Sequence, residues 1–149
     1  MAYTSIVVGT DGSPTAERAV TQASEMAAIE GARVVIVTAY TPGEAHLADR
    51  VDEVPDDLRF ALTDRVQAEA LAERGRQIAK EAGVGKVVVQ AIEGDPSSVL
   101  LEAAKDFDAG LIVVGSKGLT SHVHFILGSV ASNVSHHAPC DVLVAHTTH

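Results

Sequence analysis

Two segments of the sequence combine glycine with small polar residues in a spacing that suits the binding of an anion. Residues 9–13 read Gly-Thr-Asp-Gly-Ser, and residues 115–118 read Gly-Ser-Lys-Gly and are separated by nine residues from Gly128-Ser129. Glycine lets backbone N–H groups approach an anion closely and also permits a positive φ. A helix beginning at Ser129 would add free N–H groups and a partial charge of roughly +0.5. The spacing therefore predicts a phosphate-binding site.

This glycine spacing differs from the better-known phosphate loops. A Walker A loop requires a lysine before its final Ser or Thr, whereas Gly128 precedes Ser129. The dinucleotide fingerprint requires Gly-x-Gly-x-x-Gly after the first strand, and residues 9–14 lack it. A P-loop nucleotidase and a nicotinamide dehydrogenase are therefore disfavoured. Each glycine alone could also form a turn or precede a helix, so the prediction depends on their joint placement.

Alternating strands and helices would bring the two segments to one edge of a sheet. Nearly continuous runs of Val, Ile and Leu predict buried parallel strands. These strands cover residues 5–10, 33–39, 86–92, 111–114 and 142–145. In open parallel sheets, ligands bind beyond the carboxyl ends of the strands. We therefore expect one three-layer α/β domain whose glycine segments lie at that edge.

Helix starts and stops support the same arrangement. Ser13 is expected to cap a first helix that begins with Pro14 and ends at Gly31. A third helix is predicted to open at Asp95-Pro96, and a fourth covers about residues 129–137.

A longer second helix is predicted over about residues 57–82. It contains Gly75, at a cost of about 1 kcal/mol relative to alanine. Residues 41–56, which precede it, are typical of a surface loop. The helix is expected to bury a drifting stripe made of Leu58, Leu62, Val66, Ala70 and Ile78.

Composition limits the partners. The 149 residues carry a formal charge of −9 without any Lys/Arg run, which disfavours a nucleic-acid partner but allows a nucleotide held by backbone N–H groups. The single cysteine, Cys140, precludes an internal disulfide and is expected to act as a small apolar residue at a strand. Residues 1–5 lack a basic region and a long apolar run, so we expect no signal peptide, no membrane span and a cytoplasmic location.

The glycine segments and their flanks resemble the universal stress protein family. The Gly-x2-Gly-x9-Gly-Ser pattern over residues 115–129 matches the ATP-binding motif of that family, and residues 6–13, 112–116 and 137–144 match its flanking strands. The resemblance covers essentially the whole chain, as one domain over residues 1–149. It implies a five-stranded parallel sheet of order 3-2-1-4-5 with helices on both faces. It also implies an adenine nucleotide between strands one and four.

The resemblance also implies which residues form the nucleotide site. By position, the nucleotide would lie against Gly9, Thr10, Asp11, Ala39, Val114, Gly115, Gly118, Gly128, Ser129 and Val130. Asp11 would contact the ribose or adenosine side, Ala39 would contact adenine, and the last four residues would hold phosphates. From the residues alone, Asp11 could instead cap the first helix, and Ala39 could be part of the sheet core. Tyr40 could cover adenine or lie on the surface.

The chain also resembles a subgroup of the family that binds cyclic AMP, so the sequence does not decide between cyclic AMP and ATP. Residues 9–13, 39–40, 133–135 and 144–148 match that subgroup, so cyclic AMP and ATP, the latter with Mg²⁺, are both expected ligands. Hydrolysis requires a metal site and a positioned water, and near the motif only Lys117 and Asp11 are charged. We assign no catalytic residue and no protein metal site. The expected function is a binder or sensor in stress response, with a slow ATPase and a nucleotide-independent interaction module as alternatives.

The C-terminal part of the chain suggests two further features. His122 and His124 would add positive charge near the phosphates below about pH 6.5, or would simply lie in a solvated loop. Many family members form dimers through the last strand. Residues 141–146 suit that role because an unpaired apolar edge strand is otherwise prone to aggregation. The resemblance therefore implies a homodimer.

Overall fold

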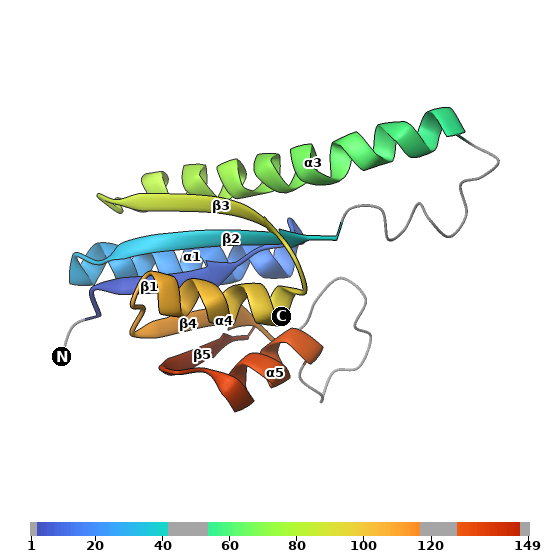
Figure 1. Ribbon diagram of the computed structural model, residues 1–149. Helices are drawn as coiled ribbons and strands as arrows, with labels where there is room; N and C mark the ends of the chain where they lie inside the picture. Colours follow the sequence, from blue (N-terminus) through green and yellow to red (C-terminus); the bar gives the residue numbers. More distant parts are fainter. Residues whose placement is uncertain (1–2, 42–53, 117–127, 147–149) are drawn as a thin grey trace.

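Strands and helices alternate along the chain in the computed structural model, which describes residues 3–41, 54–116 and 128–146 (Figure 1). For residues 54–64 it describes the course of the backbone alone. The elements are β1 (Ser5–Gly9), α1 (Pro14–Glu30), β2 (Arg33–Tyr40), α3 (Val54–Glu81), β3 (Val87–Glu93), α4 (Pro96–Asp106), β4 (Leu111–Gly115), α5 (Ser129–His137) and β5 (Asp141–Ala145). Every predicted strand and helix is present.

The five strands form one parallel sheet. Their order is β3-β2-β1-β4-β5, and all four neighbouring pairs are parallel. The helices α1 and α3 pack on one face, and α4 and α5 pack on the other. In Figure 1, α1 lies behind the sheet while α4 and α5 lie in front of it. The α/β class, the three layers and the strand order are confirmed.

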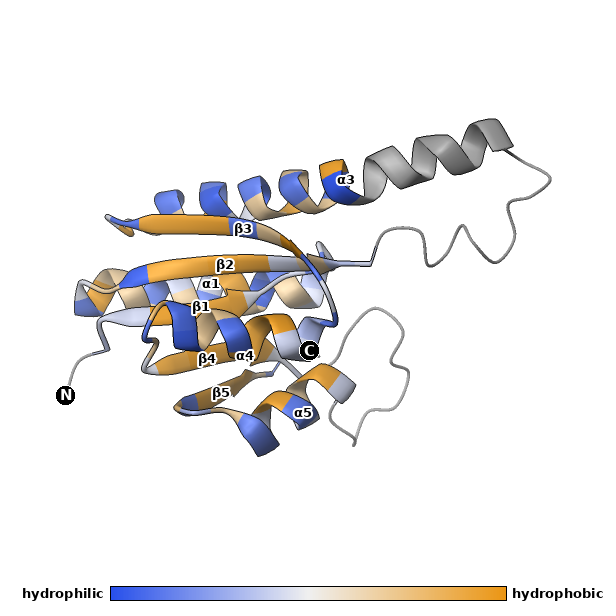
Figure 2. Cartoon of the chain, viewed as in Figure 1, coloured by the Kyte–Doolittle hydropathy of each residue, from blue (hydrophilic) through white to orange (hydrophobic). Residues whose placement is uncertain are grey.

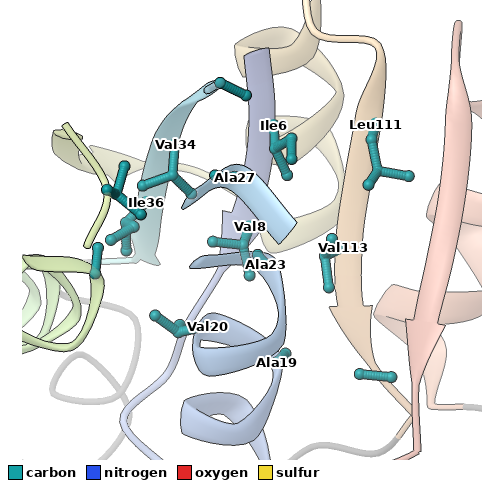
Figure 3. Close-up of a cluster of buried hydrophobic side chains, with 14 residues drawn as sticks. Ile6, Val8, Ala19, Val20, Ala23, Ala27, Val34, Ile36, Leu111 and Val113 are labelled. Carbon is teal, nitrogen blue, oxygen red and sulfur yellow. The ribbon is translucent and has the colours of Figure 1, made fainter. Parts of the chain in front are cut away.

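Each strand contributes side chains to two cores. Ile6 and Val8 of β1 pack beneath α1 and α3 (Figure 3), whereas Val7 between them packs beneath α4 and α5. This alternation follows from the period of two residues in a strand. Because both faces are covered, the strands are hydrophobic along most of their length (Figure 2). None of the helices formed by described residues has the apolar length that a bilayer crossing requires.

The predicted caps fix the ends of two helices. Ser13 is the N-cap of α1, and its Oγ accepts a hydrogen bond from the amide of Ala16 at 3.1 Å. Gly31 ends this helix in the left-handed conformation, with φ 69°. At the start of α4, Asp95 Oδ2 accepts from the amide of Ser98 at 3.1 Å. Side-chain caps thus satisfy one free amide at each of these N-termini.

The second predicted helix differs from its prediction in two respects. It begins at Val54, inside the segment predicted as a loop, and residues 42–53 of that segment lie outside the described residues. The predicted buried stripe is wrong at Val66, which is 59% exposed, and at Ala70, which is exposed. Ile78 is half-buried, and the side chains of Leu58 and Leu62 lie outside the description. Residues spaced by four rotate about 40° per step around a helix, so such a stripe turns away from the sheet.

Small residues form the buried face of α3 instead. Ala68, Ala72, Gly75 and Ala79 are all buried, and their spacing of three and four residues keeps them on one face. A Cβ atom at Gly75 would lie 2.7 Å from Cγ2 of Ile36 in β2. Glycine therefore allows the helix to approach the sheet closely, which explains a residue that sequence analysis treated only as a helix penalty.

Candidate functional site

The two glycine segments meet where the strand order reverses. The strands β1 and β4 are hydrogen-bonded neighbours. After β1 the chain continues into α1 on one face of the sheet, and after β4 it continues to α5 on the opposite face. Such a reversal opens a crevice beyond the carboxyl ends of the two strands. Gly9 ends β1 and Gly115 ends β4, so both lie at the carboxyl ends of neighbouring strands, the place where the sequence predicts a ligand. The two strands are labelled in Figure 1.

A tight turn follows β1. The amide of Thr10 donates to the carbonyl of Val37 at 3.0 Å, which ties the turn to β2. Thr10 Oγ1 accepts from the amide of Gly12 at 3.1 Å, and Asp11 Oδ1 accepts from the amide of Ser13 at 2.9 Å. Thr10 is buried and Asp11 is exposed. The turn therefore holds a carboxylate at the crevice with its position fixed by a backbone hydrogen bond.

The alternative in which Asp11 caps α1 is wrong. Ser13 is the N-cap, and its hydroxyl lies 3.0 Å from the hydroxyl of Thr15. Asp11 precedes the cap by two residues and accepts from Ser13, not from an amide within the helix. Its other carboxylate oxygen has no hydrogen bond to any described residue, so Asp11 has an acceptor to offer a ligand.

Hydrogen bonds attach the start of α5 to the end of β4. The amide of Ser116 donates to the carbonyl of Ala145 at 2.9 Å, and the amide of Gly128 donates to the carbonyl of Ser116 at 2.8 Å. Inside the helix, the amide of Ser132 donates to the carbonyl of Gly128 at 3.0 Å. The N-terminus of α5 therefore lies at the crevice.

Three amides at this N-terminus are available to a ligand. Gly128 is the N-cap, and no side chain of a described residue caps the helix, in contrast to Ser13 in α1 and Asp95 in α4. Within the described ranges, the amides of Ser129, Val130 and Ala131 accordingly have no acceptor. These donors coincide with the positive end of the helix dipole, an arrangement that attracts an anion.

The reason for glycine at position 128 differs from the prediction. Its φ of −62° and ψ of 162° are extended, so the positive φ invoked for glycine is not used there. Its own amide is also occupied by Ser116. What glycine contributes is the absence of a capping side chain. Sequence analysis missed the amide of Ala131, although counting the first three residues of a helix from Ser129 would have identified it.

Three of the remaining predicted residues belong to the core beneath α4 and α5. Ala39 and Val130 are half-buried against the core beneath α4 and α5. Val114 is 3% exposed and belongs to the same core. Tyr40 is half-buried at the end of β2, and its carbonyl accepts from the amide of Gly94.

Four residues of the predicted site and its surroundings belong to the segment between β4 and α5. Gly118 and Lys117, together with His122 and His124, lie outside the described residues. Among the residues that are described, no three His, Cys, Asp or Glu side chains gather as metal ligands would. The described part of the site contains amide donors and one carboxylate, with apolar residues of the core next to them.

Cys140 behaves as the sequence predicts. The residue is half-buried and packs against the core beneath α4 and α5. Burial, followed by the negative charge of Asp141, raises the pKa of the Cys140 thiol. Because the thiolate is the nucleophilic form, this environment suits a structural residue.

A hollow of about 300 Å³ lies at the other end of the sheet, by the N-terminal ends of the strands. Arg33 lines it and is held by Ser5 Oγ at 3.0 Å and by the carbonyl of Phe107 at 2.6 Å. Lys86 and Asp108 also line it. The C-terminal ends of α1 and α4, each with a partial negative charge, border this hollow. Its charges therefore nearly cancel, in contrast to the N-terminus of α5.

Comparison with known proteins links this geometry to one family. The family model described as universal stress protein family matches residues 2–146. Universal stress protein Rv1636 of Mycobacterium tuberculosis is 36% identical over 147 residues, which cover 99% of each chain. A universal stress protein crystallised in complex with cAMP has a TM-score of 0.75 and 34% identity, over 99% of this chain and 100% of that one. The universal stress protein from Archaeoglobus fulgidus in complex with dAMP has a TM-score of 0.66 and 25% identity, over 97% and 98% of the two chains.

Proposed function

The chain belongs to the universal stress protein family, and from this premise we propose that it binds an adenine nucleotide, cyclic AMP or ATP, as a sensor in the stress response. The observation that carries the proposal is the uncapped N-terminus of α5, which the Gly128–Ser116 hydrogen bond attaches to the end of β4, the strand next to β1 and its Asp11 turn. Two relatives of the same fold have structures with an adenine nucleotide, cAMP in one and dAMP in the other.

Each part of the crevice has a role in this proposal. The amides of Ser129, Val130 and Ala131 bind the phosphate, and the exposed Ser129 hydroxyl adds a donor. Asp11 accepts a hydrogen bond from the ribose, and Ala39 contacts adenine. In this proposal Gly9 and Thr10 line the pocket, and Val114 and Gly115 form its floor. Gly118 and Gly128 belong to the part that holds phosphate, where Gly128 leaves the α5 amides without a capping side chain.

The donor count bears on the choice of nucleotide. Cyclic AMP carries one singly charged phosphate, which three amides and one hydroxyl can match. ATP carries three phosphates, so it would need further donors from the loop that contains Gly118, and Mg²⁺ to offset its charge. The described donors therefore favour cyclic AMP. We place this function in the cytoplasm, where both ligands occur and where a lone thiol such as Cys140 stays reduced.

Calorimetry tests the proposal directly. Titration of the protein with cyclic AMP, with ATP and Mg²⁺, and with GTP as a base-specificity control should show binding of an adenine nucleotide and weak or no binding of GTP. Phosphate release from ATP, measured in parallel, distinguishes a binder from the alternative slow ATPase. A protein that binds neither adenine nucleotide would support the other alternative, an interaction module of the same fold.

We also propose that the protein is a homodimer through β5. This strand forms one outer edge of the sheet, and its residues Val142, Leu143 and Val144 are only half-buried. At the other edge, Arg76 Nη1 donates to the carbonyl of Val87 in β3 at 3.5 Å, so a side chain already covers that edge. Unpaired apolar edges favour association, and β5 is the less protected of the two.

Proline substitution tests the dimer. The amide of Asp141 and the carbonyl of Ala145 face β4, so by alternation the amide of Val144 faces outward. Val144→Pro removes an outward donor while it spares the pairing with β4, and should yield monomers in light scattering. Val89→Pro, at an outward amide of β3, is the matched control and should leave the dimer intact. A wild-type monomer at high micromolar concentration would refute the dimer.

A further inference from the structure

Helix α3 touches the turn that holds Asp11. A Cβ atom at Gly12 would lie 2.5 Å from Cδ2 of Leu71, and within 3.4 Å of two further atoms of that side chain. Gly12 has a φ of 82°, a conformation that side chains other than glycine rarely adopt. The Leu71 side chain therefore packs directly on the backbone of the turn, on the side where any Cβ would project.

None of the turn's hydrogen bonds with described residues involves α3, so only side-chain packing by Leu71 connects this helix to Gly12. The amide of Thr10 binds β2, and the amides of Gly12 and Ser13 bind side chains within the turn itself. A second contact anchors α3 nearby, because Arg74 Nε lies 3.1 Å from Glu17 Oε2 in the first turn of α1.

We propose that Leu71 is a positioning residue, which holds the Gly12 turn in its positive-φ conformation and thereby presents the Asp11 carboxylate to the ligand. The inference rests on the proposed nucleotide site. Glycine populates positive and negative φ about equally, so the isolated turn would sample several conformations. The contact with Leu71 selects one of them before the ligand arrives. Through this contact, the helix α3 contributes to nucleotide affinity although Leu71 is not among the residues proposed to bind the phosphate.

The expected effect follows from the populated fraction. When only a fraction of molecules has the competent turn, the apparent Kd rises by the inverse of that fraction. Shortening Leu71 to alanine leaves the hydrogen bonds of the turn in place, so we expect a competent fraction of about one third to one tenth. The Kd for cyclic AMP, or for ATP with Mg²⁺ if that is the ligand, should therefore rise about three- to tenfold.

The experiment compares six proteins by calorimetry at a temperature where all are folded. They are the wild type, Leu71→Ala, the conservative Leu71→Met, Val66→Ala as a control at an exposed site of the same helix, Leu71→Ala combined with Asp11→Asn, and Asp11→Asn alone. Leu71→Met should retain most of the affinity, and Val66→Ala all of it. Asp11→Asn alone provides the reference for the combined variant.

Coupling between the two sites separates positioning from general destabilisation. If Leu71 acts through Asp11, Leu71→Ala should cost little further affinity once Asp11 is already asparagine. Amide exchange of Gly12 and Ser13 in the unliganded protein should also accelerate in Leu71→Ala, while exchange in β4 should not. Should Leu71→Ala fail to fold, Leu71→Met and Leu71→Val provide a graded series.

The outcomes distinguish this inference from the proposed function. A wild type that binds no adenine nucleotide overturns both. A wild type that binds, with unchanged affinity in Leu71→Ala, overturns the positioning role alone. Equal losses from Leu71→Ala with and without Asp11 would also overturn it, because the effect would then not pass through the carboxylate.

Discussion

The backbone N–H of Gly128 donates to the carbonyl oxygen of Ser116 across 2.8 Å, so the first turn of α5 is attached to the end of β4. This bond determines which amides remain for a ligand. It uses the amide of the cap residue itself and leaves those of the following three residues directed out of the helix. Since Gly128 has no side chain, nothing in the described part of the chain competes with an anion for them.

A side-chain cap at this position should therefore stabilise the fold and weaken binding. In Gly128→Asp, the carboxylate can accept from the amide of Val130 or Ala131, as Asp and Ser do at other helices. The φ of −62° at this residue poses no obstacle. We expect the free energy of unfolding without ligand to rise by about 0.5 kcal/mol and the Kd for nucleotide to increase at least tenfold. Denaturant titration and calorimetry measure the two quantities.

Gly128→Asn is the matched control for charge. The amide side chain can occupy the same donors without repelling a phosphate, so its affinity should lie between those of Gly128→Asp and the wild type. Unchanged nucleotide affinity in both variants would mean that the N-terminus of α5 does not hold the phosphate.

A methyl group at position 75 should destabilise the protein despite the better helix propensity of alanine. In Gly75→Ala, the new Cβ would lie 2.7 Å from Cγ2 of Ile36, which is itself fully buried. Propensity favours alanine by about 1 kcal/mol, whereas overpacking costs about 1–3 kcal/mol. We expect a net loss of up to about 2 kcal/mol in denaturant titration. Gly85→Ala, where no atom lies within 4 Å, should have little effect, and a stabilised Gly75→Ala would contradict the tight contact.

The sequence predicts the sheet better than it predicts α3. Strands buried on both faces are read directly from continuous apolar runs, and the ends of α1 follow from Ser13 and Gly31. The buried face of α3 consists of alanine and glycine, whose small side chains give a weak periodic signal. A larger residue, Val66, lies on the exposed side. The predicted stripe included it and therefore turned away from the face that is buried.

The candidate site likewise has features that could be predicted before the structure and features that could not. Its expected location follows from the glycine segments, which the sequence contains, and from the strand order, which the family resemblance implies. The engagement of the Gly128 amide by Ser116, and the contact of Leu71 with Gly12, depend on the relative placement of elements. Residue types alone do not determine such contacts, because packing between distant segments decides them.

Two buried hydroxyl groups should be dispensable for stability. Ser24 Oγ in α1 and Thr38 Oγ1 in β2 are buried and have no hydrogen-bond partner among the described residues. Removing an unpaired buried polar group avoids its desolvation cost. We therefore expect Ser24→Ala and Thr38→Val to be neutral or stabilising by about 1 kcal/mol, as measured by denaturant titration.

Ser5→Ala is the corresponding control. The Ser5 hydroxyl is buried as well, but it accepts from Arg33 Nε at 3.0 Å. Its removal should cost about 1–2 kcal/mol, because it leaves part of the guanidinium without its partner. If Ser24→Ala proves as costly as Ser5→Ala, the Ser24 hydroxyl has a partner, such as a buried water.

Alkaline pH should loosen the attachment of the N-terminal segment to β5. The Tyr3 hydroxyl donates to Asp141 Oδ2 at 2.7 Å, and this hydrogen bond is the main cause that raises the pKa of Tyr3 above 10. Because the folded-state pKa is the higher one, this contribution is complete below pH 10 and is lost as the pH rises through the pKa of the folded protein. The free energy of unfolding should therefore decline above pH 10 more steeply in the wild type than in Tyr3→Phe. Parallel pH profiles for the wild type and Tyr3→Phe would show that the Tyr3–Asp141 bond contributes nothing in solution.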